Sequence, residues 1–297
     1  MEKGMRTNVR GGAAVLAALL LLGCPGGAAQ EGARPESAAT PNEAAIEQAW
    51  DILRADYVSP HARVRAPVVS LLGLLPDNPF AETMAEAALT DKDARIRAAG
   101  ASALGMMRAR QAAPKLRQAE EDADPAAALA AANALLQLGD DEGYEAYYAV
   151  LTGKRKGHPG LVAGEEETVR QTLQDPKKMA ELSFVAGLGF VPFAGVGWET
   201  LVTVTKNDNT PVRAAAAKKL APDPDPKTAD ALVEAASDKS WIVRAAALEA
   251  IALRNDPALL PQVAPHLADA KKTVRLVAAA CVIRLGDLAA KSAPPQK

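Results

Sequence analysis

Hydrophobic positions in the C-terminal part of the chain follow the period of an α-helix. In the stretch DKSWIVRAAALEAI (residues 238–251), the apolar stripe consists of Ile242, Val243, Ala246, Ala247, Ala250 and Ile251. Positions at i, i+4 and i+8 lie along one face of a helix. The polar residues ahead of this stripe are typical of a turn. The stretch therefore predicts a turn followed by a helix whose apolar face enters a core.

The same pattern returns several times along the chain. A Val-Arg or Ile-Arg pair marks the copies Val64-Arg65, Ile96-Arg97, Val212-Arg213, Val243-Arg244 and Val274-Arg275. These pairs are 32, 116, 31 and 31 residues apart, and the long gap holds a weaker copy at Ala127. Eight residues after each mark lies another aliphatic residue, in order Leu72, Leu104, Leu135, Leu220, Ile251 and Val282. Because a second helical segment precedes each copy, we predict units of two helices.

An aspartate lies five residues ahead of the mark in four copies, at Asp91, Asp122, Asp238 and Asp269. A carboxylate in this turn can accept hydrogen bonds from free amides and oppose the positive end of the helix. We expect arginine–aspartate pairs to link adjacent repeats into a structural ladder. Its predicted members are Asp91, Arg97, Asp238, Arg244, Asp269 and Arg275.

These repeats resemble HEAT repeats, especially the short bacterial form related to phycobilisome-lyase repeats. The resemblance rests on the turn aspartate with the Val-Arg pair, and on Pro114 and Pro261 eight residues ahead of the aspartate position. It covers residues 43–288 with a break in the middle. It implies an all-α fold, a right-handed α-solenoid (armadillo-type superhelix) of about seven helix pairs. One pair cannot bury its apolar face alone, so neighbours must stack.

Composition agrees with closely packed helices. Hydrophobic residues make up 49 % of the chain and aromatic residues only 4 %. Alanine is the best helix former, and its small side chain lets helices approach each other. The formal net charge is −2. This value argues against a nucleic-acid partner, because nucleic-acid-binding proteins normally carry an excess of basic residues.

The N-terminus reads as a secretion signal. Lys3, Arg6 and Arg10 precede an apolar run from Ala13 to Leu22, which is too short to span a bilayer. The following Leu-Leu-Gly-Cys resembles a bacterial lipobox and predicts lipidation at Cys24. The alternative is ordinary cleavage after Ala29, which leaves a soluble periplasmic protein. We predict export to the periplasm and anchoring to a membrane by lipid.

The predicted organisation has six parts. A signal peptide (1–23) and a flexible tether (24–42) precede N-terminal repeats (43–153), an insertion (154–176), C-terminal repeats (177–288) and a disordered tail (289–297). The insertion is either a binding loop or a tolerated surface loop. The apolar segment 184–204 either packs in the core around a Pro-Gly turn or exposes Phe190, Phe193 and Trp198 to a partner or a lipid surface. Its glycines and Pro192 argue against a membrane span.

The sequence offers no recognisable catalytic constellation. Its three histidines lack helical His or Glu partners, and neither His-Glu-x-x-His nor Cys-x-x-Cys occurs. Some HEAT-like proteins are di-iron hydroxylases with paired His-Glu motifs, and this chain lacks those pairs. We predict no catalytic, cofactor-binding or metal-binding residues and no enzyme activity. The predicted function is a scaffold that binds another protein along the inner faces of its second helices. The alternatives are a lyase-like enzyme or enzyme subunit working through residues 154–176, and docking of segment 184–204 to a membrane.

Overall fold

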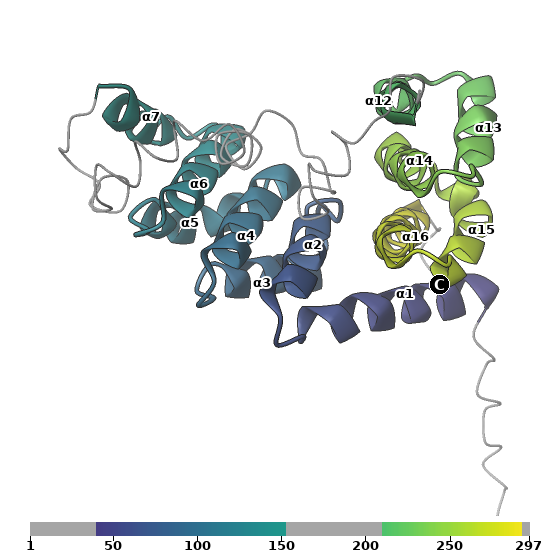
Figure 1. The fold of residues 1–297 in the computed structure, drawn as a ribbon, viewed down its shortest axis with the longest axis horizontal. Coiled ribbons are helices and arrows are strands. Elements are labelled where there is room, and N and C mark those ends of the chain that lie inside the picture. The colour runs from purple at the N-terminus through teal and green to yellow at the C-terminus, as the bar shows by residue number, and fades with distance from the viewer. Residues whose placement is uncertain (1–39, 153–209, 293–297) are drawn as a thin grey trace, which may run out of the picture. The chain divides into compact units, whose positions relative to one another are not determined.

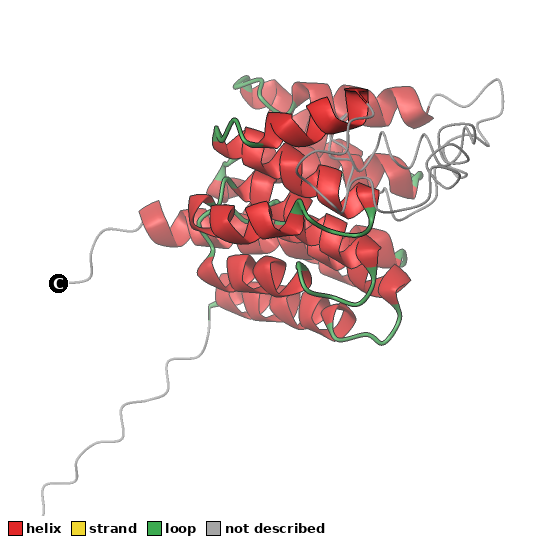
Figure 2. Cartoon of the chain, turned by 90° about the vertical axis from the view of Figure 1, so that its left-hand side faces the viewer, coloured by secondary structure: helices red, strands yellow, loops and turns green. Residues whose placement is uncertain are grey.

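The computed structural model describes residues 40–152 and 210–292, which belong to one unit of the chain by their contacts. The described residues form helices, turns and loops, and no strand occurs among them (Figure 2). The predicted all-α solenoid is confirmed. Cys24, Phe190, Phe193, Trp198 and the insertion 154–176 lie outside the described residues.

The N-terminal part contains three complete helix pairs and a further helix (Figure 1). In each pair the first helix leads through a turn into the second. The elements are α1 (Pro41–Tyr57) with α2 (Ala62–Leu72), α3 (Pro79–Ala88) with α4 (Ala94–Met107), η1 (Arg110–Ala112) and α5 (Ala113–Ala119) with α6 (Pro125–Leu138), and then α7 (Gly143–Thr152).

The C-terminal part repeats this arrangement. Its elements are α12 (Thr210–Leu220), α13 (Pro226–Ala235) with α14 (Trp241–Arg254), and the group η2 (Pro257–Leu259), α15 (Leu260–Val263) and η3 (Ala264–Ala268) with α16 (Lys272–Ser292). Two first helices are thus broken into short 3₁₀ and α segments, at Pro114 and around Pro261. Proline lacks a backbone N–H and fits the first turn of a helix, so it divides the longer helix that the sequence pattern predicts. The last helix continues to Ser292, four residues beyond the predicted end of the repeats.

Local sequence explains where the helices begin and end. Thr40 and Glu43 form a reciprocal capping box at α1, with the Thr40 side chain accepting from the Glu43 amide. Asp93 and Asp124 cap α4 and α6. The ladder aspartates, expected to cap the second helices, instead accept the amide two residues later inside the turn, as Asp91 does from Asp93 at 2.8 Å. The helix cap itself thus falls two residues after the ladder aspartate.

The second helices stack on one another and form the centre of the core. Helix α4 lies between α2 and α6, and α14 lies between α12 and α16. Small residues permit this closeness, because a Cβ added to Gly105 of α4 would meet the Cα of Ala134 in α6 at 2.8 Å. Of the six aliphatic positions predicted in the core, five are fully buried and Leu220 is 39 % exposed. Small side chains and a stripe of larger aliphatics therefore build the stack as predicted.

The N-terminal and C-terminal parts contact each other through the first helix, α1, and the last helix, α16. Helix α1 packs along α16, and α2 also contacts α16. Lys272 of α16 forms an ion pair with Asp56 of α1 at 2.8 Å, and Asn78 donates to Asp287 at 2.7 Å. We call this contact the joint. In space the C-terminal pairs therefore precede the N-terminal pairs, in the order α12, α14, α16, then α1 with α2, α4 and α6. Sequence analysis did not anticipate this order.

Candidate functional site

In several repeats an arginine of the second helix clamps two turns at once, as Arg244 of α14 does. Nη1 of Arg244 donates to the Asp238 carbonyl in its own turn at 2.9 Å. Its Nε and Nη2 donate to the two carboxylate oxygens of Asp269, in the next repeat, at 2.8 and 2.9 Å. A planar guanidinium suits this bidentate geometry, whereas a lysine would not reproduce it. The arginine therefore joins one repeat to the repeat that follows it in the sequence.

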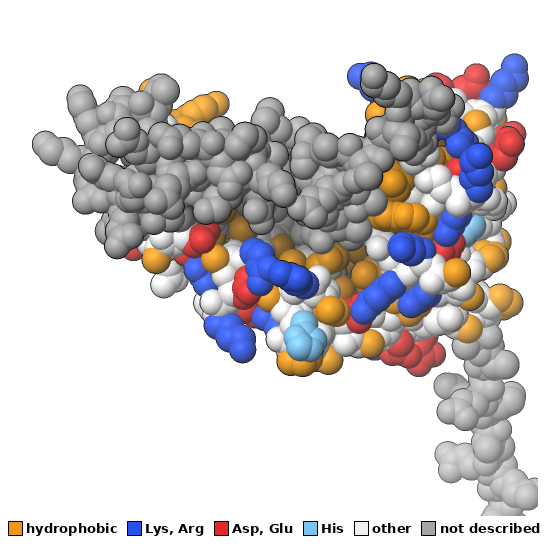
Figure 3. Space-filling model, in the orientation of Figure 1, with side chains coloured by type: hydrophobic (Ala, Val, Ile, Leu, Met, Phe, Trp, Pro, Cys, Tyr) orange, Lys and Arg blue, Asp and Glu red, His pale blue; other side chains and the backbone are white. Residues whose placement is uncertain are grey.

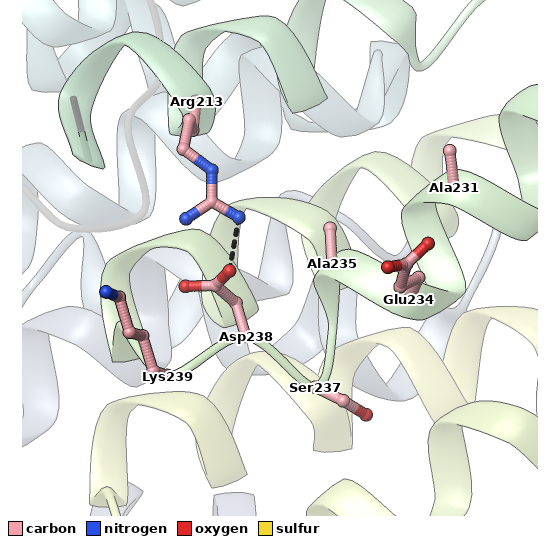
Figure 4. A pocket seen from close by; sticks show the side chains of 7 residues that line it. All are labelled: Arg213, Ala231, Glu234, Ala235, Ser237, Asp238 and Lys239. Carbon is pink, nitrogen blue, oxygen red and sulfur yellow. Dashed lines mark hydrogen bonds and ion pairs between the residues drawn. The ribbon is translucent and has the colours of Figure 1, made fainter.

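The same rung occurs in three other places. Arg65 binds Asp91, Arg97 binds Asp122 and Arg213 binds Asp238. Figure 4 shows Arg213 of α12 reaching the Asp238 carboxylate in the turn ahead of α14. These residues line a shallow hollow with Ala231, Glu234, Ala235, Ser237 and Lys239. Arg65 and Arg213 were not among the predicted ladder members, although their Val-Arg pairs carried the signal.

Hydrogen bonds from the arginines keep the aspartates ionised. The hydrogen bond from Arg213, followed by the one from the Ser240 amide, lowers the pKa of Asp238. Burial acts against ionisation of Asp122, but the hydrogen bond from Arg97 prevails and the pKa is lowered. A folded-state pKa below the unfolded value means that this stabilisation is present at neutral pH and is lost as pH falls through the folded pKa. The rungs at Asp238 and Asp122 are therefore acid-sensitive structural contacts.

Arg275, also predicted for the ladder, lies at the joint and behaves differently. Its Nη1 donates to the carbonyls of Asp269 and Ala270 in its own turn, at 2.7 and 3.3 Å. Among the described residues it binds no carboxylate. The first repeat has Ser59 where four other repeats have an aspartate. The Ser59 hydroxyl accepts a hydrogen bond from the amide of His61, and the Ser59 carbonyl accepts one from Nη1 of Arg65. The ladder therefore breaks at the joint, where repeats that are neighbours in space are not consecutive in the sequence.

Two glutamates are buried in the stack. Glu249 of α14 is 2 % exposed, and its Oε2 lies 2.9 Å from Nζ of Lys218 in α12. Burial outweighs the attraction of Lys218 and raises the pKa of Glu249 to about 7. Glu120, at the end of α5, is also buried. Burial, with the negative charges of Glu142 and Asp140, raises its pKa to about 7.

An exposed cluster of large side chains lies on the first helices. The rings of Trp50 (α1) and Phe80 (α3) meet edge to face, with centroids 5.0 Å apart. The Arg54 guanidinium lies 5.6 Å from the Trp50 ring centroid and 5.3 Å from that of Phe80. Phe80 is 46 % exposed. We call these three residues the aromatic cluster. Sequence analysis missed it, although Trp50 and Phe80 are one repeat length apart.

Between residues 40 and 152 and between 210 and 292, no three His, Cys, Asp or Glu side chains are arranged to hold a metal ion. In the same ranges no helix combines the length and the hydropathy needed to cross a bilayer. Cys281 is fully buried in α16 and unpaired.

Comparison with known proteins agrees with this architecture. Residues 199–283 match the family model for HEAT repeats. In this matched range lie the helix pairs whose rungs run from Arg213 to Asp238 and from Arg244 to Asp269. No curated protein matches the sequence.

One similar solved structure is that of human deoxyhypusine hydroxylase in complex with glycerol. Its identity with this chain is 19 %, the match covers 82 % of this chain and 98 % of that one, and the TM-score is 0.30. The hydroxylase is an enzyme. The prediction that the present chain is not an enzyme stands against this match, and we withdraw it.

Proposed function

We propose that the protein is an exported HEAT-repeat scaffold that binds another protein through the aromatic cluster. Tryptophan and arginine are the residue types most enriched among those that dominate interface energies, and aromatic residues are enriched at interfaces generally. Here they gather on adjacent first helices, with the Arg54 guanidinium 5.6 and 5.3 Å from the two ring centroids. The stacked second helices are buried over most of their length, as α14 is from Ala245 to Ala252. The first helices thus offer this cluster from a rigid support.

The two helices that carry the aromatic cluster, α1 and α3, are firmly held relative to each other. Tyr57 of α1 donates its hydroxyl hydrogen to the Met84 carbonyl of α3 at 2.9 Å, which ties the two helices that carry the cluster. Asn78 caps α3 by accepting from the Ala81 amide at 3.0 Å. A surface held in this way loses little side-chain and loop entropy on binding, which favours affinity.

Site-specific crosslinking tests the proposed docking surface. A photoreactive amino acid at Phe80 should give one discrete crosslinked protein in intact cells. The same group at Lys227, an exposed residue of α13, is the matched control and should give none. Adding Trp50→Ser to the Phe80 reporter should remove the crosslink, and because Trp50 also packs against the core, circular dichroism checks that the variant stays folded. Equal crosslinking from both positions, or a crosslink that survives Trp50→Ser, would contradict the proposal.

We also propose that the scaffold is lipid-anchored through Cys24. The Leu-Leu-Gly-Cys stretch at the end of a short apolar run supports this modification. Mass measurement of the mature N-terminus tests it. We expect a chain that begins at an acylated Cys24. An unmodified chain that begins at Gln30 would refute anchoring and leave export and partner binding to be judged separately.

A further inference from the structure

A positively charged row follows the turns that precede four second helices. It consists of four exposed side chains, Arg63, Lys92, Lys239 and Lys271, which we call the basic edge. None of the four forms an ion pair with another described residue. Figure 3 shows lysine and arginine side chains gathered over the ends of α4, α2, α16 and α14. Because the joint places α16 beside α1 and α2, turns about 150 residues apart in the sequence contribute to one row.

The positive charge of this edge is local. Residues 56–65, 91–97, 238–244 and 269–275 together hold ten Lys or Arg and five Asp, within a chain of net charge −2. Most of these aspartates are already paired with arginines of the ladder. The opposite ends of the second helices carry both signs of charge, with acidic residues at Asp77, Asp140 to Glu142, Asp223, Asp225 and Asp256 and basic residues at Arg108, Arg110, Lys218, Lys219, Arg254 and Lys291. The opposite edge is therefore close to neutral, and the excess of positive charge lies at the basic edge.

Helix dipoles add to the positive potential. Helices α2, α4, α14 and α16 all begin at the basic edge. Each helix N-terminus carries about half a positive charge, which favours nearby anions. Because the four helix N-termini face the same way, their partial charges add to the side-chain charges along the whole basic edge.

We propose that the basic edge binds an anionic lipid surface. Its charges project from separate turns, and three of the four are lysines, which act as flexible point charges and not as bidentate forks. Such an arrangement suits a diffuse layer of headgroups better than one carboxylate or one peptide. Trp241 lies beside Lys271, whose Nζ is 5.4 Å from the ring centroid. Tryptophan is enriched where one end of a side chain is apolar and the other is wet, as at a membrane surface.

This contact is compatible with an anchor at Cys24 but does not rest on it. Asp56, near the end of α1, pairs with Lys272 at the start of α16. Thr40 therefore lies about 25 Å from the basic edge, at the other end of the 17-residue helix α1. The sixteen residues from Cys24 to Thr40 reach at most about 55 Å when extended. The anchor and the edge can therefore touch the same surface.

Vesicle co-sedimentation of the full, unacylated chain tests the proposal. Binding to vesicles of equal parts phosphatidylglycerol and phosphatidylcholine should exceed binding to pure phosphatidylcholine and should weaken with salt. The variant Lys92→Glu, Lys239→Glu, Lys271→Glu should lose at least about 100-fold in affinity for the mixed vesicles, since each basic residue near such a surface contributes about fivefold. Affinity for pure phosphatidylcholine should stay the same.

The matched control is Lys219→Glu, Lys227→Glu, Lys291→Glu. It makes the same change in net charge at exposed positions away from the basic edge. We expect its affinity for mixed vesicles to change by less than about fivefold, the contribution of a single residue at the surface. Equal losses in the two variants would overturn the proposal, as would no loss in the edge variant. Binding of soluble polyglutamate without binding to the mixed vesicles would also overturn it, in favour of an acidic polypeptide partner.

Discussion

The contact between α14 and α16 and the contact between α16 and α1 use the same helix in different ways. In the first, Arg244 and Asp269 form a bidentate rung whose side chains are 16 % and 9 % exposed. In the second, the polar contact at the same end is Lys272 with Asp56, and the lysine is 52 % exposed. The rung links units that follow each other in the sequence. The joint links the last unit to the first and depends mainly on apolar packing.

The difference shows which contacts a repeat sequence encodes. Each rung needs an arginine in one unit and an aspartate about 25 residues later, so repetition generates it automatically. The joint needs residues of the first unit that match the last, and repetition does not supply them. Ile46, Ala49 and Leu53 of α1 meet this need by packing in the core that also contains α16.

Replacement of a core residue by alanine, either in the regular stack or at the joint, should have the largest effect on stability. Leu53 in α1 and Ile251 in α14 are both fully buried. Ile251→Ala and Leu53→Ala should each lower the free energy of unfolding by about 2–5 kcal/mol, through lost transfer energy and the cavity left behind. Hydrogen exchange separates them. Leu53→Ala should speed exchange first in α1, and Ile251→Ala throughout residues 210–292. Identical exchange patterns would mean that the joint is no weaker than the regular contacts.

The sequence was sufficient to predict the helix pairs, but it did not predict their order in space. Val-Arg pairs 31 or 32 residues apart, with Ile251 and its equivalents eight positions later, predicted the second helices and their buried stripe. Three of the ladder's four rungs, Arg65–Asp91, Arg97–Asp122 and Arg213–Asp238, joined a predicted member to a partner outside the predicted set. The joint leaves no periodic signal, because contacts such as Asn78 with Asp287 join residues 209 apart. The basic edge depends on the joint and was hidden for the same reason.

The buried ion pair in the regular stack should make stability depend on pH. Glu249 has a pKa of about 7 in the fold, above its ordinary 4.5. The unfolded chain therefore releases this proton first, and stability falls as pH rises from about 4.5 to 7. Glu249→Gln should remove this slope, so between pH 5 and 8 wild type should lose about 3 kcal/mol more than the variant. Urea unfolding across this range measures it. If the unfolding free energies of wild type and Glu249→Gln changed in parallel with pH, Lys218 would already compensate the charge of Glu249.

Glycine-to-alanine substitutions should distinguish backbone contacts from side-chain contacts. A Cβ on Gly105 would meet the backbone of Ala134, whereas a Cβ on Gly286 would meet Ile46, with Cγ1 at 2.8 Å. A side chain can rotate away and a helix backbone cannot, so Gly105→Ala should cost about 1–3 kcal/mol and Gly286→Ala less. Alanine's better helix propensity offsets part of either cost. Thermal unfolding of Gly286→Ala with and without Ile46→Ala provides the check. Failure of Ile46→Ala to restore stability would mean that the joint is as rigid as the α4–α6 contact.

Substitutions that remove the polar contacts should have the smallest effects on stability, and the loss should be larger at the rung than at the joint. Arg244→Ala removes two hydrogen bonds to Asp269 and leaves that partly buried carboxylate without its cation, which should cost about 1–3 kcal/mol. Lys272→Ala removes an exposed pair and should cost about 0–1 kcal/mol. Double-mutant cycles with Asp269→Ala and Asp56→Ala isolate the two coupling energies. Added salt should weaken the Lys272 coupling more, because exposed charges are screened more strongly than partly buried ones. Equal couplings would mean that the rung and the joint share one kind of polar contact, and the contrast drawn between them would then rest on apolar packing alone.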